Sequence, residues 1–278
     1  ELFFDLIFVF AITQLSHGLL KHLSLQGLLH TVVLFMGTWW LWIFTSWVTN
    51  WLDPEKIPVR IMLFGLMLCG LLLSSAIPEA FAGKGWLFGC MFAAMQIGRT
   101  LFMLYALRGE DKALRRNFQR MLVWMLSSGA CWLLGGFADP TQRLWWWGAA
   151  LAIEYIAPPA YFWVPGLGHS RTSDWNIDGA HMAERCMLFV IIALRESILV
   201  TGATFAALPL TADLLAVIVS CFLGSLAMWW VYFDSGAERA AHRAMRSSDP
   251  GRFARLSYNY LHLLIIFGII LCAVGDEI

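Results

Sequence analysis

Charged residues are scarce in this sequence. Asp, Glu, Lys and Arg make up 14% of the 278 residues, whereas soluble domains contain about 25%. Hydrophobic residues make up 59%, and the mean hydropathy is +0.67. This composition excludes an ordinary soluble protein and indicates a membrane protein.

The sequence also lacks an excess of charge of either sign. Nineteen Lys and Arg residues balance nineteen Asp and Glu residues, which gives a formal net charge of +0. A neutral chain has no overall field that attracts polyanions. We therefore do not expect nucleic acid as a partner.

Motifs of known chemistry are missing too. The sequence contains no HExxH, GxSxG, P-loop or GxGxxG pattern. His181 and Glu184 share a helical face, but no third metal ligand follows at a clear spacing. The cysteines lie in apolar segments without metal-ligand spacing: Cys69, Cys90, Cys131, Cys186, Cys221 and Cys272. We predict no enzymatic activity, no catalytic residue, no cofactor and no metal site.

Long apolar runs are abundant. A membrane-spanning helix needs about 20 apolar residues, and a backbone in lipid must satisfy its own hydrogen bonds. The sequence therefore predicts an all-α, polytopic membrane bundle with about nine visible helices. The predicted spans are 2–20, 26–51, 59–77, 86–107, 118–137, 144–164, 181–205, 210–234 and 257–275. The fifteen tryptophans are expected mainly at the membrane–water boundary.

Lys and Arg are unevenly distributed over the connections between these spans. Cytoplasmic loops carry the excess of positive charge, so the richer side is predicted to be cytoplasmic. The N-terminal end of the chain then lies on that side of the membrane. The richer side carries Lys56, Arg60, Arg108, Lys112, Arg115, Arg116, Arg120, Arg171, Arg239, Arg243, Arg246, Arg252 and Arg255. The other side carries Lys21, Lys84 and Arg143.

The start of the chain resembles a later segment. ELFFDLIFVFAITQLS aligns with ERCMLFVIIALRESIL from Glu184, and the Trp pairs at 39–40 and 229–230 follow in both. Six helices separate equivalent helices, which predicts a parallel repeat of six helices with the second repeat truncated. The predicted domains are a first repeat at 1–165, a cytoplasmic linker at 166–180 and the start of a second repeat at 181–278.

Several ionisable or polar residues fall inside the predicted spans. Such residues cost about 2.5–3.5 kcal/mol each on insertion and normally face the bundle interior. They form either an ion path or structural pairs between helices, such as Arg99 with Glu154. The candidates are Asp5, Arg99, Glu154, His181, Glu184, Arg185, Arg195, Glu196, Tyr258 and His262.

Arg195 and Glu196 are the most informative candidates because they lie deep in the seventh predicted span. Asp5 is the next most informative candidate, since a carboxylate is unusual in a helix that enters lipid. We expect Asp5 to bond to partners such as Arg185, Tyr258 or His262 inside the bundle.

Four segments together resemble the bacterial low temperature requirement protein A family: ELFFDLIFVFAITQLSH, WWLWIFTSWVTN, HMAERCMLFVIIALRESIL and YNYLHLLIIFGI. The resemblance implies a polytopic membrane protein associated with growth in the cold, without a settled biochemical activity. Where the family pattern has ALGES, this chain has Arg195 in place of the Gly.

The first helix is also distantly similar to that of potassium channels with an FSD signature. Phe3-Phe4-Asp5 is followed by Phe8, Ala11-Ile12-Thr13 and Leu15 in matching register. This likeness implies a pore-like core built from two six-helix repeats.

Three hypotheses about function remain open. The first is a transporter or channel for a proton or monovalent cation, and the second is a non-transporting scaffold or a sensor of the bilayer and cold stress. The third is an intramembrane enzyme that acts on a lipid. The expected partners are the lipid bilayer, a small ion as substrate and a second copy of the chain in a homo-oligomer.

Overall fold

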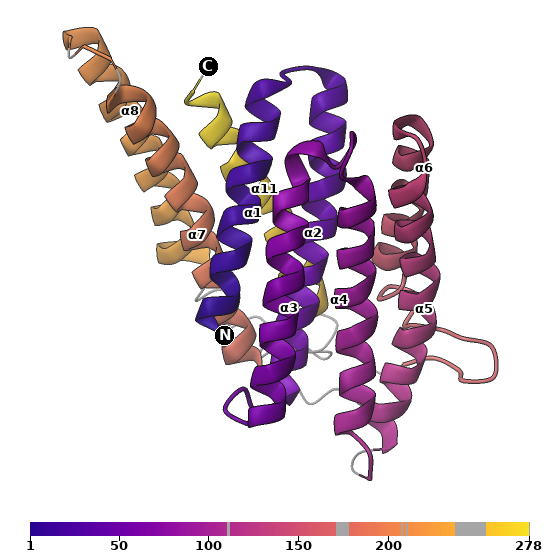
Figure 1. Ribbon diagram of the computed structural model, residues 1–278. Coiled ribbons are helices and arrows are strands. Elements are labelled where there is room, and N and C mark those ends of the chain that lie inside the picture. Colours follow the sequence, from indigo (N-terminus) through magenta and orange to yellow (C-terminus); the bar gives the residue numbers. More distant parts are fainter. Residues whose placement is uncertain (110–111, 171–177, 207, 210, 237–253, 278) are drawn as a thin grey trace. The chain divides into compact units, whose positions relative to one another are not determined.

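The computed structural model describes residues 1–109, 112–170, 178–206, 208–209, 211–236 and 254–277. Within these residues the chain forms nine α-helices and no strand (Figure 1). They are α1 (Leu2–Lys21), α2 (Leu25–Trp51), α3 (Ile57–Ala76), α4 (Gly85–Ala106), α5 (Lys112–Phe137), α6 (Pro140–Ile156), α7 (Gly179–Ala206), α8 (Ala212–Trp230) and α11 (His262–Gly275). Shorter helical pieces are η1 (Ile77–Glu79) and two π-helices, η3 (Val231–Gly236) and η4 (Arg255–Leu261).

Local sequence sets several of the helix starts. The side chains of Ser24, Asp139 and Thr211 accept hydrogen bonds from backbone N–H groups at the starts of α2, α6 and α8. These residues satisfy N–H groups that have no partner within the helix. Pro140, as the first residue of α6, has no N–H that would need a partner.

Seven helical segments are long and apolar enough to cross a membrane, so the chain is a multi-pass membrane protein. Helices α5 and α6 are the two that fall short. The first turns of α5 carry Lys112, Arg115 and Arg116, and α6 has 17 residues. Both were expected as spans, and both pack among the longer helices of the bundle.

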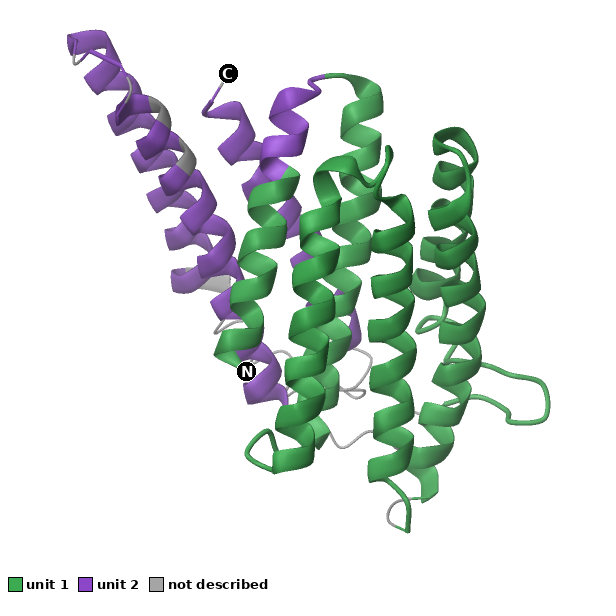
Figure 2. Cartoon of the chain, in the orientation of Figure 1, with its two compact units in different colours: residues 1–15, 24–177 green, residues 16–23, 178–278 purple. Residues whose placement is uncertain are grey.

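The described chain divides into two compact units (Figure 2). Unit 1 holds residues 1–15 and 24–177, and unit 2 holds residues 16–23 and 178–278. We describe each unit by itself.

Unit 1 contains a core of tryptophan. Trp39, Trp40 and Trp42 on α2 are at most 1% exposed. The predicted location of tryptophan at the membrane–water boundary does not fit these three residues, because packing inside the bundle buries their indole rings. Trp145, which is 76% exposed, fits the expected behaviour better. Large aromatic side chains thus fill the centre of unit 1 rather than only its rim.

Glycines allow α4 and α5 to approach closely. A Cβ atom added to Gly89 would overlap the backbone carbonyl oxygen of Trp132. A Cβ atom on Gly136 would lie 3.0 Å from the carbonyl oxygen of Gly85. Small residues at helix contacts bring backbones together in membrane bundles, where dispersion contacts replace the hydrophobic drive.

The sixth helix ends just before Pro158–Pro159, the pair that was expected to kink or end it. It was expected over 144–164, but α6 spans Pro140–Ile156. Pro158 and Pro159 stop it, because proline has no N–H and clashes with the preceding turn. The chain then turns sharply at Tyr161 and Phe162, which both have positive φ. Phe162 is nevertheless buried and fixes this turn against the core of unit 1.

Unit 2 is more open than unit 1. It combines α7, α8, η3, η4 and α11 with Ser16–Leu23. Within α8, Ser225 is the residue recorded as buried. Most of the apolar surface of this helix is therefore uncovered by the part of the chain that the structure describes.

Parts of the predicted organisation fall outside the described residues. These are residues 171–177 of the predicted linker, together with Arg171, Arg239, Arg243, Arg246 and Arg252. Residues 164–170 form a compact turn in which Val164 and Gly168 exchange backbone hydrogen bonds. The internal repeat and its domain boundaries stay predictions, and unit 2 differs from the predicted second repeat by including Ser16–Leu23.

Candidate functional site

Asp5 lies inside unit 1 rather than facing lipid. It is buried on α1, and its Oδ1 accepts a hydrogen bond from Nε1 of Trp42 on α2 at 2.8 Å. Trp42 is a partner that the sequence reasoning missed. The expected partners Arg185, Tyr258 and His262 belong to unit 2 and are described with it. The carboxylate thus joins the first two helices.

Arg99 on α4 is the most deeply buried cation in unit 1, with 1% exposure. Its Nη1 donates to the carbonyl oxygen of Leu41 at 3.0 Å and to Oγ1 of Thr45 at 2.8 Å. Its Nη2 donates to Oε1 of Gln96, one helical turn earlier. The guanidinium group therefore locks α4 to α2 through neutral oxygen atoms.

Glu154 on α6 is fully buried. One carboxyl oxygen, Oε1, accepts from Ser128 Oγ at 2.8 Å, Trp132 Nε1 at 3.2 Å and Gln96 Nε2 at 3.4 Å. The other oxygen, Oε2, has no hydrogen-bond partner among the described residues. The two oxygens of one carboxyl group thus differ sharply in their surroundings.

Gln96 bridges Arg99 and Glu154. Its amide oxygen accepts from Arg99, and its amide nitrogen donates to Glu154. Within the described part of unit 1, Arg99 and Glu154 do not form the direct ion pair that was predicted, and each bonds to Gln96 instead. The amide accepts from the cation and donates to the carboxylate, so the two charges need not touch.

Glu196 forms the polar centre of unit 2. It is buried on α7, and its Oε1 accepts a hydrogen bond from Oγ of Ser16 at 2.9 Å. Ser16 belongs to the last part of α1, which lies in unit 2. The carboxylate on the seventh helix therefore meets the first helix, in the stripe that also carries Asp5.

Ser197, the next residue on α7, makes its own set of polar contacts. Ser197 Oγ lies 2.8 Å from Ser225 Oγ on α8 and donates to Oδ2 of Asp276 at 3.1 Å. Asp276 caps the end of α11. Glu196 thus contacts α1, whereas Ser197, about 100° further round α7, contacts α8 and the end of α11. We call these five residues the Glu196 cluster: Ser16, Glu196, Ser197, Ser225 and Asp276.

The other candidates on α7 do not join this cluster. Arg195 and Glu184 are exposed, His181 is half-buried and Arg185 is buried. Arg195 and Glu196 point in different directions because successive helical residues are about 100° apart. The sequence reasoning treated them as a pair, whereas the structure buries the acid and exposes the base.

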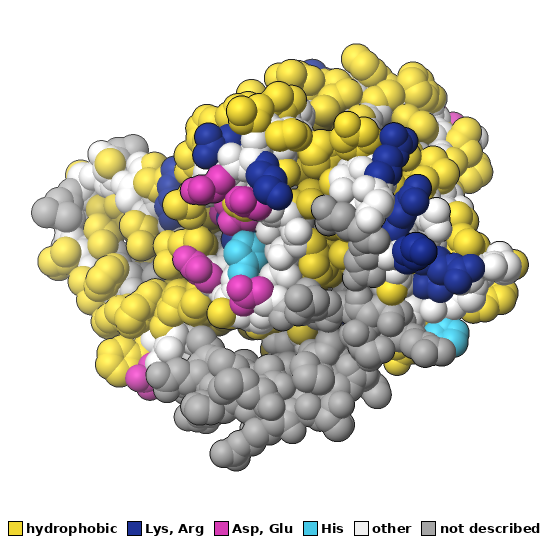
Figure 3. Space-filling view, turned by 90° about the horizontal axis from the view of Figure 1, so that it is seen from below, with side chains coloured by type: hydrophobic (Ala, Val, Ile, Leu, Met, Phe, Trp, Pro, Cys, Tyr) yellow, Lys and Arg dark blue, Asp and Glu magenta, His cyan; other side chains and the backbone are white. Residues whose placement is uncertain are grey.

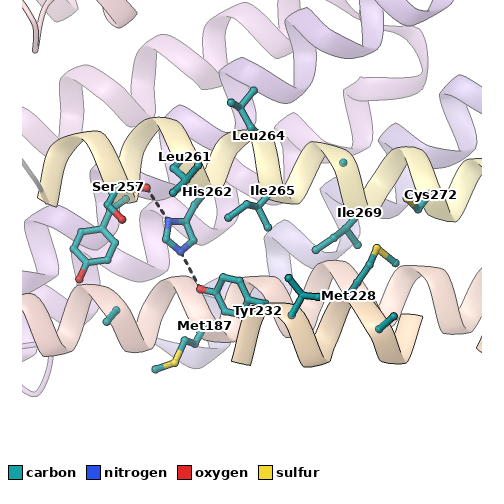
Figure 4. Close-up of a pocket in the computed structure, with 15 residues that line it drawn as sticks. Met187, Met228, Tyr232, Ser257, Leu261, His262, Leu264, Ile265, Ile269 and Cys272 are labelled. Carbon is teal, nitrogen blue, oxygen red and sulfur yellow. Dashed lines mark hydrogen bonds between the residues drawn. The ribbon is translucent and has the colours of Figure 1, made fainter. Parts of the chain in front are cut away.

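Tyr258 and His262 lie in a different part of unit 2. The hydroxyl group of Tyr258 donates to the carbonyl oxygen of Gly179 at 3.1 Å. Nε2 of His262 lies 2.9 Å from the hydroxyl group of Tyr232. These contacts border a pocket between α7–α8 and η4–α11 (Figure 4).

No group of three or more His, Cys, Asp and Glu side chains that could hold a metal ion occurs within the described ranges. The carboxyl groups of Asp5, Glu154, Glu196 and Asp276 accept hydrogen bonds from hydroxyl, indole or amide groups.

Sequence reasoning missed the neutral partners of these charged groups. Gln96 carried a usable signal, because it lies one helical turn before Arg99 and inside an apolar span. No sequence signal marked Ser128, Trp132 and Ser225. Serine and tryptophan occur throughout the chain, and only helix packing brings these particular residues to the charged groups.

Comparison with known proteins adds the following. The sequence model of the family described as bacterial low temperature requirement A protein (LtrA) matches residues 1–278. An uncharacterized protein of Rhizobium meliloti (strain 1021) is 45% identical over 278 residues, which cover 100% of this chain and 68% of that relative. No solved structure matches the chain.

Proposed function

The chain belongs to the bacterial low temperature requirement A protein family, and we propose that it transports or conducts a small ion, a proton or a monovalent cation. The observation that carries this proposal is the Glu196 cluster. A carboxylate with 2% exposure lies near the middle of α7, a helix long and apolar enough to span a membrane. Ionisable groups at such positions are costly and typically mark ion or proton pathways.

The composition of the Glu196 cluster suits a hard, singly charged ion. Its members supply two carboxylates and three hydroxyl groups, and hydroxyl groups reorient as a cation or proton arrives. Oxygen atoms are the ligands that hard cations prefer.

Glu154 is a weaker candidate for the path. Arg99 lies one amide group away, and the positive charge of its guanidinium offsets that of the carboxylate. Such compensated sites more often hold helices together. We therefore assign Glu154 to the support of unit 1 and Glu196 to the ion.

The proposed setting is a bacterial cytoplasmic membrane with the N-terminal end on the cytoplasmic side. The positive-inside rule supports it. In unit 1, Lys56 and Arg108 lie in the connections from α2 to α3 and from α4 to α5, and Arg60 and Lys112 lie in the first turns of α3 and α5. Lys and Arg side chains gather on the face that contains these connections (Figure 3).

Ion flux into liposomes tests the proposal. The purified full-length protein is reconstituted, and potassium, sodium and proton flux are measured in turn over a range of pH and membrane potential. Glu196→Gln keeps the size of the side chain and removes its charge, so flux should fall to the level of protein-free liposomes. Glu184→Gln is the matched control, because Glu184 lies on the same helix but is exposed; it should leave flux unchanged.

Thermal unfolding of both variants separates transport from structure. Loss of flux with an unchanged melting temperature supports a path through the Glu196 cluster. Absence of flux for every ion in the unaltered protein contradicts the proposal and favours a scaffold or sensor.

A further inference from the structure

Unit 2 contains a pocket that is lined by two of the candidates, Tyr258 and His262, and by no residue of the Glu196 cluster. It lies between α7–α8 and η4–α11 and has a volume of about 660 Å³, within the roughly 300–1,000 Å³ of small-molecule sites. Its walls are mainly apolar, with Met187, Met228, Ile265 and Ile269 among the lining residues (Figure 4). Asp, Glu, Lys and Arg are absent from the residues that line it.

The polar groups of the pocket are connected through His262. Nδ1 of His262 lies 2.8 Å from the carbonyl oxygen of Ser257, and a carbonyl oxygen only accepts. Nδ1 therefore carries a proton. No carboxylate among the described residues lines the pocket to pair with a charged imidazolium, so the ring is neutral and Nε2 is an acceptor. The hydroxyl group of Tyr232 must then donate to Nε2, across 2.9 Å. Figure 4 shows this chain of two hydrogen bonds along one side of the pocket.

Donation by Tyr232 leaves its oxygen lone pairs available. A phenolic hydroxyl group donates one hydrogen bond and also accepts, and the donor is used by His262. The hydroxyl oxygen of Tyr258 can also accept a hydrogen bond, because its proton is donated to the carbonyl oxygen of Gly179. The pocket is therefore lined by two tyrosines whose oxygens can each still accept a hydrogen bond, and a ligand hydroxyl group can supply the donor.

Two irregular helices shape this polar side. Tyr232 lies in the π-helix η3, and Tyr258 lies in the π-helix η4, which ends just before His262. A π-helix widens the turn and redirects side chains, and such turns frequently occur at functional sites. Both tyrosines thereby reach the pocket from separate helices.

Gly268 is a small residue in the wall of the pocket. It lines the pocket on α11, and a Cβ atom added there would meet nothing within 4 Å. A side chain at position 268 would therefore begin in open space in the wall of the pocket. A larger side chain at position 268 would occupy it without displacing the helix.

We propose that this pocket binds an uncharged lipid whose polar end is a hydroxyl group. The apolar walls take the hydrocarbon chain, and the hydroxyl group donates to the phenolic oxygen of Tyr232 or Tyr258. A fatty acid or a phospholipid headgroup would bring a charge into a site without an opposite charge, which is costly. The surrounding helices span a membrane, so the bilayer supplies ligands of this class directly.

Photolabelling of the full-length protein in liposomes tests this site. The probes are a long-chain alcohol that carries a diazirine on its chain and the methyl ether of the same molecule. The ether keeps the shape but cannot donate a hydrogen bond. We expect the alcohol to label residues of η3 and α11, and the ether to label them about three- to tenfold less, as one hydrogen bond predicts.

A steric variant provides the second arm. Gly268→Phe should abolish labelling of the pocket by filling it. Gly224→Phe is the matched control, since Gly224 is also a helical glycine of unit 2 with open space at its Cβ position, but it lies outside the pocket; labelling should remain. Because the comparison of the two probes uses the unaltered protein, it decides the question even where a variant does not fold.

Equal labelling by the alcohol and the ether overturns the proposal, as does unchanged labelling in Gly268→Phe. Absence of labelling in the full-length protein also overturns it, because another part of the protein then fills the pocket. None of these outcomes depends on ion transport, since Glu196 does not line the pocket.

Discussion

The indole nitrogen of Trp42 donates a hydrogen bond to Oδ1 of Asp5 at 2.8 Å inside unit 1. This contact explains how a helix that starts in the membrane tolerates a carboxylate in its first turn. The acid is buried against α2, where an indole N–H donates to it. A buried acceptor costs little when it has such a partner.

Trp42→Phe is therefore expected to destabilise the protein by about 2–4 kcal/mol, because it removes a hydrogen bond to a charged group and leaves a small cavity. Thermal unfolding in detergent measures the change. Trp86→Phe is the control, since Trp86 is 50% exposed and should change stability by less than about 0.5 kcal/mol. Equal losses in both variants would show that the contact with Asp5 is unimportant.

Gln96→Leu is expected to destabilise unit 1 by about 2–4 kcal/mol. The substitution keeps the side-chain volume but removes both the acceptor used by Arg99 and a donor to Glu154, which leaves buried charges less well satisfied. Chemical denaturation measures the loss. Gln142 is exposed, so Gln142→Leu serves as the matched control. A loss below about 1 kcal/mol in Gln96→Leu would mean that Arg99 and Glu154 do not depend on the bridge.

Gly89→Ala is expected to cost about 1–3 kcal/mol, because the new Cβ atom overlaps the carbonyl oxygen of Trp132 and pushes α4 from α5. Gly98 lies on the same helix with open space at its Cβ position. Gly98→Ala should therefore leave stability unchanged or raise it by up to about 1 kcal/mol. Melting temperatures of the two variants give the comparison, and equal shifts would argue against close packing at Gly89.

Arg195→Leu is expected to make insertion of α7 into a membrane more favourable by about 3 kcal/mol, because Arg195 is exposed in the middle of an apolar helix. An insertion assay with the isolated segment measures this. Lys21→Leu on α1 is a control at a helix end, where a long cation reaches the interface and the change should be small. An equal gain in both would place residue 195 near the interface.

The sequence alone predicted the all-α membrane bundle and the approximate position of each helix. The length of an apolar run is a local property of the sequence. Asp53–Pro54 interrupts the runs after the end of α2, and Asp139–Pro140 interrupts them at the start of α6. The sixth helix follows the same rule: apolar residues continue to Val164, but Pro158–Pro159, which were expected to kink or end the helix, stop it at Ile156.

The charged candidates inside the spans were also found from the sequence, because such residues are rare there and costly. Their partners were decided by the tertiary structure alone. Helix rotation and packing determine that Glu196 meets Ser16, that Gln96 bridges Arg99 and Glu154, and that Arg195 turns outward. A hydrogen bond depends on the relative positions of two helices, and apolar periodicity does not encode those positions.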